Sequence, residues 1–124
     1  MSYIIGSPLL GVLKGANFNS TSDQPIAISG AKYVIRRIVV TNASTSLTTA
    51  AGGLYTGAAK SGTTIVGAAQ IYTALTAASK FVDLTLEAGI ATDSLTATSI
   101  FLSLTTGQGG AATADVYIFG DLLP

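Results

Sequence analysis

The stretch FLSLTTGQGGAATADVYIFG, residues 101–120, carries the clearest secondary-structure signal in the chain. Its apolar residues Leu102 and Leu104 alternate with polar residues, which is typical of a strand with one buried face. The alternation resumes after the glycine-rich segment, where Val116 and Ile118 continue the buried row. The pattern therefore predicts a β-hairpin in which Leu102 lies opposite Val116.

The other face of this predicted hairpin carries three aromatic residues among polar ones. In the same register Phe101 lies opposite Tyr117, and Phe119 follows two residues later. Aromatic side chains opposite each other on neighbouring strands are in contact, and a contiguous exposed apolar patch is typical of an interface. We expect Phe101, Tyr117 and Phe119 to form an oligomer interface. Two alternatives are that the N-terminal segment or the second sheet of the same subunit covers them.

Further strand signals are short and are separated by clusters of glycine, serine and threonine. They comprise residues 25–29, 33–42, 54–59, 63–67 and 81–86. Residues 68–79 allow at most one or two turns of helix, because Ile71, Leu75 and Ala78 have helical spacing but Thr73 and Thr76 argue against a helix. Seven or eight short strands without a long helix predict an all-β fold, an antiparallel β-sandwich or jelly roll.

In two of these strands, alternation predicts the direction of charged residues. In residues 33–42, strand alternation predicts that Arg36 and Arg37 point to opposite faces. In residues 81–86, the same alternation predicts that Phe81 and Asp83 point outward.

The first 24 residues differ from the rest, because their apolar residues occur in small groups without a period. We expect an extended N-terminal arm over residues 1–24, preceding a sandwich domain over residues 25–124. The alternative is an edge strand of the same domain. Isolated apolar groups cannot form a core of their own, so we expect them to contact a neighbouring subunit or the surface of a larger assembly. They are Tyr3, Ile4, Ile5, Leu9 and Leu10.

The composition describes a nearly uncharged protein of one domain. The chain has 124 residues, the size of a single domain. Charged residues make up only 10% of the chain, far below the roughly 25% that is usual for soluble domains. Six basic residues balance six acidic ones, so net charge does not discourage association.

The residue types leave little for catalysis, metal binding or nucleic-acid recognition. Histidine and cysteine are both absent, which removes the commonest general base and the usual zinc ligands. The segment GQGGAA, residues 107–112, precedes a strand and not a helix, so it is a turn and not a phosphate-binding loop. We expect no enzyme activity, no cofactor, no metal and no small-molecule substrate. The basic residues are dispersed, which also argues against nucleic-acid binding.

Targeting signals are equally sparse. The apolar stretch PLLGVL, residues 8–13, has no basic residue before it and is too short for a membrane span. We expect a protein that is made and left in the cytoplasm, unless another protein complex carries it elsewhere, and that does not enter a membrane.

In its overall style the chain resembles the capsid decoration, or cement, proteins of tailed bacteriophages. The likeness lies in the low charge, the abundance of small residues, and stretches such as KFVDLTL and SLTTGQGGAATADVYIFGD. No diagnostic motif transfers a functional residue by position. The resemblance implies a structural virion protein, commonly a homotrimer, that binds the major capsid protein on the outer surface of the head and stabilises it.

Two other functions fit the same expected fold. One is a head-fibre, tail or receptor-binding component of a virion. The other is a carbohydrate-binding β-sandwich module, although such modules often use tryptophan platforms and this chain has no tryptophan.

Overall fold

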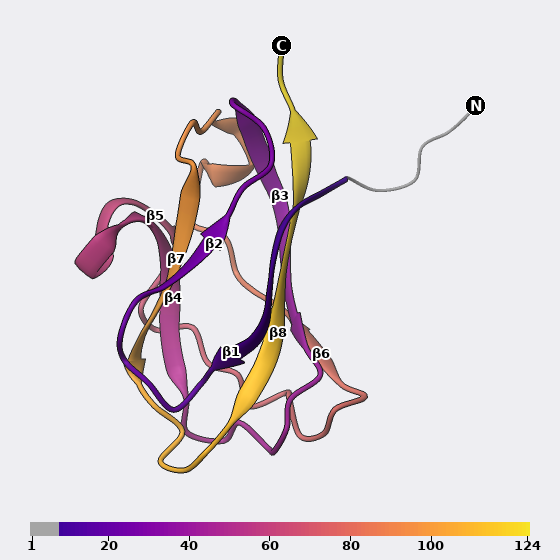
Figure 1. Cartoon of the computed structure of the whole chain (residues 1–124), viewed down its shortest axis with the longest axis vertical. Helices are drawn as coiled ribbons and strands as arrows, with labels where there is room; N and C mark the ends of the chain where they lie inside the picture. Colours follow the sequence, from indigo (N-terminus) through magenta and orange to yellow (C-terminus); the bar gives the residue numbers. More distant parts are fainter. Residues whose placement is uncertain (1–7) are drawn as a thin grey trace.

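The computed structural model describes residues 8–124, and within this range the chain is all-β with two short 3₁₀ turns (Figure 1). The strands are β1 (Leu9–Asn17), β2 (Gln24–Ala27), β3 (Tyr33–Thr41), β4 (Ala51–Gly57), β5 (Ser61–Val66), β6 (Phe81–Asp83), β7 (Ser99–Thr106) and β8 (Thr113–Leu122). The 3₁₀ turns are η1 (Ala58–Lys60) and η2 (Ile90–Thr92). The predicted all-β class is confirmed, and residues 68–79 form no helix.

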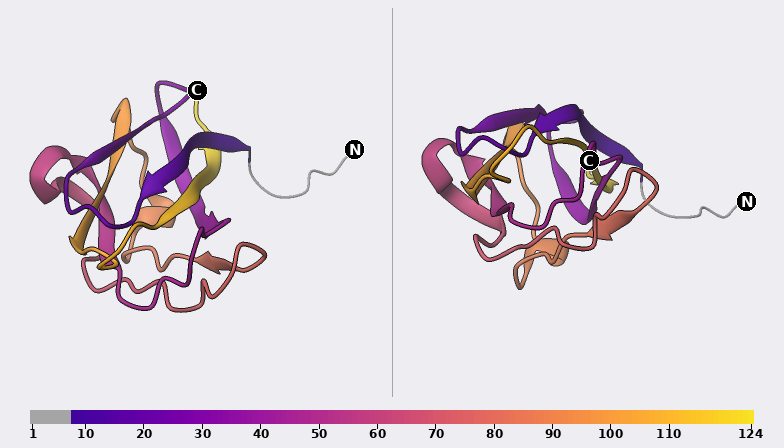
Figure 2. Two further views of the ribbon diagram at one scale, coloured as in Figure 1. Left: turned by 60° about the horizontal axis from the view of Figure 1, so that its bottom comes forward. Right: turned by 90° about the horizontal axis from the view of Figure 1, so that it is seen from below.

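The strands form two antiparallel sheets of four strands each. Sheet A has the order β1-β8-β3-β6, and sheet B has the order β2-β7-β4-β5. Figure 2 places β4 and β5 on one side of the molecule and β3 and β6 on the other. The inward rows of both sheets belong to one hydrophobic cluster, which includes Ile38 and Ile118 from sheet A and Leu54 and Leu102 from sheet B.

The predicted hairpin is wrong, because β7 and β8 belong to different sheets. Strand β7 pairs with β2 and β4, whereas β8 pairs with β1 and β3. The connection between them is held by other loops: the backbone N–H of Gln108 donates to Phe18 O at 2.8 Å, and its side-chain oxygen accepts from Ala50 N at 3.0 Å. These contacts direct the chain across the end of the core instead of into a tight turn.

The predicted N-terminal arm is also wrong from Leu9 onward, where the alternative of an edge strand holds. Strand β1 pairs with β8 along its length, and Leu10 and Phe18 are buried in the core. Leu10 therefore contacts its own domain and not a neighbour. Tyr3, Ile4 and Ile5 lie outside the described residues.

A β-bulge in β3 corrects a further expectation. The register of β3 against β8 shifts between Ile35 and Arg37, so the residue between them has no partner of its own. A bulge of this kind breaks strand alternation. As a result Arg36 and Arg37 are both exposed and both reach carboxylates of sheet A, Asp121 and Asp83 respectively.

Candidate interaction surface

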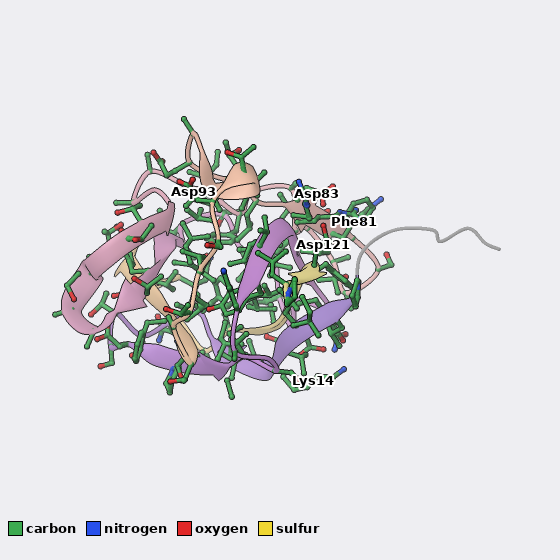
Figure 3. All side chains as sticks on the ribbon, turned by 90° about the horizontal axis from the view of Figure 1, so that it is seen from above. Lys14, Phe81, Asp83, Asp93 and Asp121 are labelled. Carbon is green, nitrogen blue, oxygen red and sulfur yellow. The ribbon has the colours of Figure 1, made fainter. Side chains whose placement is uncertain are left out.

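The outward-facing side of sheet A, hereafter the A face, presents three rows of side chains that follow the strand register. One row runs Leu9–Phe119–Arg37, the next runs Val12–Tyr117–Val39–Asp83, and the third runs Asp115–Thr41–Phe81. Lys14, Arg36 and Asp121 complete it through their ion pairs. Figure 3 shows Lys14, Phe81, Asp83 and Asp121 on one side of the molecule, away from Asp93.

The A face carries exposed apolar side chains on its two edge strands, β1 and β6, and half-buried ones on its central strands. Leu9, Val12 and Phe81 are 48%, 39% and 57% exposed. Tyr117 and Phe119 are half-buried beside them, with stacked rings whose centroids lie 6.4 Å apart. Within residues 8–124, the only other large hydrophobic residues that are this exposed are Leu122, at the end of β8, and Ile71, in the loop before β6. Exposed apolar side chains are therefore concentrated on sheet A.

Every ion pair found among residues 8–124 also lies on the A face. Arg36 contacts Asp121 at 2.8 Å, Lys14 contacts Asp115 at 3.5 Å, and Arg37 forms a two-pronged contact with Asp83. Each pair joins neighbouring strands of the sheet. Exposed pairs of this kind contribute little to stability, at most about 1 kcal/mol. Their main consequence is that the charges of the face are neutralised within the face.

Asp115 differs from the other carboxylates because it is buried. Its side chain accepts hydrogen bonds from Gly15 N at 2.8 Å and from Asn42 Nδ2 at 3.1 Å, in addition to the Lys14 contact. Burial alone would raise the pKa of Asp115, but these three donors outweigh it and lower the pKa. Lys14 also donates to the Tyr117 hydroxyl at 2.7 Å, which is the main reason that its own pKa is raised.

We predict that Asp115→Ala lowers the free energy of unfolding by roughly 1–3 kcal/mol, because it removes the charged acceptor of the part-buried hydrogen bonds from Gly15 and Asn42. Asp83→Ala is the matched control, since its carboxylate is half exposed and its loss should cost at most about 1 kcal/mol. Urea denaturation of both variants measures the difference. Equal losses of unfolding free energy in the two variants would contradict a structural role for the hydrogen bonds of Asp115.

The Asp115 carboxyl should also make the stability of the fold depend on pH under acidic conditions. A carboxyl whose pKa is lower in the folded than in the unfolded chain stabilises the fold above the unfolded pKa, and this contribution is lost as the pH falls. The wild type should therefore lose stability below about pH 4, and Asp115→Ala should lose less over that range.

The outward side of sheet B is different, because the side chain of Lys60 covers part of it and, within residues 8–124, no large apolar side chain on it is exposed. Phe101 lies between Pro25 and Tyr55, and Tyr55 is only 4% exposed. Lys60 extends over the sheet and donates to Ser103 Oγ at 2.9 Å. Phe101 is thus on the opposite sheet from Tyr117 and Phe119, and the single patch expected for these three residues is wrong. The structure brings together only Tyr117 and Phe119.

The contact between Lys60 and Ser103 also bears on chemistry. A lysine beside a serine can activate a nucleophile when the hydroxyl is accessible and the amine is neutral. Ser103 is 1% exposed, so no substrate can reach its hydroxyl in this conformation. Within residues 8–124 no group of three or more carboxylates, histidines or cysteines could hold a metal ion. The expected lack of enzyme activity stays a prediction.

Two surface grooves flank the sheets. The first lies along β1 beside the A face, has a volume of about 460 Å³, and is lined mainly by apolar residues that include Leu9, Val12 and Ile28. The second is more polar and is lined in part by Gln70, Thr85 and Glu87. Gln70 is already engaged, because its side chain bonds to Ile71 O and Thr85 N. The apolar groove extends the A face around the edge of the sheet.

Comparison with known proteins provides no independent assignment: no family model matches the chain, and neither a curated protein nor a solved structure matches it. In the part of the chain that the structure describes, no helix is long and apolar enough to cross a membrane. The functional argument therefore rests on the A face.

Proposed function

We propose that the fold is a jelly roll, the finer of the architectures expected from the sequence. The support is the nesting of the strand pairs: β1 pairs with β8, β2 with β7, β3 with β6 and β4 with β5. Such pairing arises when one long antiparallel ribbon is folded over and wrapped around a core. The wrapping adds the pairs β3–β8 and β4–β7, which complete the two sheets. Jelly rolls are frequent among viral capsid and lectin domains.

We further propose that the chain is a structural virion protein, a decoration protein that binds the outer surface of a phage head and stabilises it. The observation that carries this proposal is the A face, a broad sheet surface with exposed apolar side chains and internally paired charges. Contact surfaces of proteins combine aromatic and arginine residues at the centre with a polar rim. The resemblance in composition supplies the class of partner, the major capsid protein, and the expected homotrimer.

Removal and restoration of the protein test this function. Heads stripped of it should break at a lower temperature than intact heads, and adding the purified chain should restore the original value. Because charged residues make up only 10% of the chain, we expect binding to the head to change little between about 0.1 and about 1 M salt. Stripped and fully occupied heads of equal stability would refute the decoration function.

A carbohydrate-binding module is the second candidate, because the stacked rings of Tyr117 and Phe119 could receive the apolar side of a sugar. A glycan array separates the candidates. Binding of a defined glycan that is lost in Tyr117→Ala would favour this alternative. The absence of glycan binding, together with restored head stability, would favour decoration.

A further inference from the structure

We infer that the A face is the surface through which copies of this chain contact one another. The inference deepens the proposed function, on which it rests for its biological purpose, because it names the surface that an oligomeric decoration protein would use. The occupant is a second copy of the same chain. Three observations lead to this choice: the extent of the A face, the balance of its charges, and the lack of a comparable apolar surface on sheet B.

The extent of the A face is sufficient for a specific contact of modest size. Strands β1, β3 and β8 contain 9, 9 and 10 residues. At about 3.3 Å per residue and about 4.8 Å between strands, the sheet measures roughly 30 by 15–19 Å, or about 500 Å². Two such faces that meet about a two-fold axis bury about 1,000 Å², without counting the added area of protruding side chains, which is at the lower end for specific interfaces. The exposed side chains of Leu9, Val12 and Phe81 add to this area. Contact of this kind forms a dimer, and not the homotrimer that the resemblance implies.

The charge balance of the A face favours a copy of the chain over a charged partner. Its three cations are Lys14, Arg36 and Arg37, and its three anions are Asp83, Asp115 and Asp121. Each cation pairs with an anion of the same face, so association introduces no charge that lacks a partner. A buried charge without a partner would be costly. The whole chain has six basic and six acidic residues, so two copies approach without net repulsion.

The opposite sheet offers no comparable surface. Tyr55 is buried there, and Lys60 is tied across the strands to Ser103 and to Leu104 O. None of the exposed large hydrophobic residues found within residues 8–124 lies on a strand of sheet B. The apolar side chains that would gain most from association are therefore those of the A face.

The test compares variants of the full-length chain by sedimentation velocity over a range of concentrations. Val12→Glu places an unpaired charge in the central row, and Val12 is exposed enough for the subunit to keep its fold. We expect the wild type to associate and Val12→Glu to associate at least about ten-fold more weakly. Phe81→Ser should weaken association in the same direction. Ile71→Ser is the matched control for Phe81→Ser, because Ile71 is an equally exposed apolar residue that lies in the loop between β5 and β6 and not on the A face.

Circular dichroism and thermal melting verify that each variant is folded. A wild type that is monomeric at every concentration would overturn the inference, as would an oligomer that Val12→Glu and Phe81→Ser leave unchanged. If monomers stabilise heads through Val12 and Phe81, the A face contacts the capsid instead; the inference then fails while the decoration function survives. If copies associate through the A face but heads gain no stability, the decoration function fails and the inference stands.

Discussion

Replacement of Gly120 by alanine should lower the free energy of unfolding by about 3 kcal/mol. Gly120 lies in β8, between the neighbouring strands β1 and β3 of sheet A. A Cβ atom at this position would overlap the backbone oxygen of Val34 and would lie 2.7 Å from Leu10 Cδ1. The clash is with backbone, so it cannot be relieved by a change of rotamer. Strands β3 and β8 would have to separate, with loss of their ladder hydrogen bonds.

Gly110→Ala is the control for this prediction. Gly110 lies in the connection between β7 and β8, and no atom lies within 4 Å of the position that its Cβ would take. Its stability should change by less than about 0.5 kcal/mol. Urea denaturation of the two variants measures the contrast directly. Similar denaturation midpoints for Gly120→Ala and Gly110→Ala would contradict the close approach of β3 to β8 at Gly120.

The inward rows of the strands could be predicted from the sequence. Ile100, Leu102 and Leu104 of β7, and Val116 and Ile118 of β8, are all fully buried. Their alternation with polar residues indicates burial because side chains of a strand point to opposite faces in turn. The alternation does not indicate which strand is the hydrogen-bonding partner. Two strands that face each other across a core bury the same rows as two strands paired in a hairpin.

The pairing itself depends on residues far apart in the chain. Strand β1 pairs with β8, and β2 pairs with β7, so contacts join the beginning of the chain to its end. A local pattern cannot identify such partners. Strand β1 was also obscured by its register shifts after Leu9 and Leu13, which interrupt the period of two. The same effect hid the common face of Arg36 and Arg37, because a bulge leaves no signature in a single sequence.

Only parts of the A face could be predicted from the sequence. The outward direction of Phe81 and Asp83 follows from alternation, and the aromatic pair Tyr117 and Phe119 is visible as an irregularity on a polar face. Their assembly on one surface requires β6 to lie beside β3 and β3 beside β8. The strand order alone makes these residues neighbours, and the same order separates Phe101 from them.

A second large effect is expected at alkaline pH, where the buried phenol of Tyr72 should limit stability. Tyr72 lies in the irregular loop between β5 and β6, is fully buried, and donates a hydrogen bond to Gly52 O at 3.0 Å. Its ring packs edge-on against Phe18 with a centroid distance of 5.0 Å. Burial raises the pKa of Tyr72 far above its ordinary value near 10. The loop is thus fastened to the core by a group that must stay protonated.

The sign of the effect follows from the raised pKa. Above about pH 10 the unfolded chain releases the Tyr72 proton while the folded chain retains it, so unfolding becomes more favourable as the pH rises. The expected loss is about 1.4 kcal/mol for each pH unit above about 10. Burial also raises the pKa values of Tyr33 and Tyr55, which steepens the decline in the same direction.

Tyr72→Phe isolates the contribution of this hydroxyl. At neutral pH the variant should lose about 1 kcal/mol, because the Gly52 carbonyl loses its donor. Above pH 10 its stability should fall less steeply than that of the wild type, so the two unfolding curves should converge as the pH rises. Urea denaturation at a series of pH values from 7 to about 11 measures both effects. Parallel declines in the two proteins would mean that Tyr72 ionises in the folded chain, and that the loop between β5 and β6 opens readily to solvent.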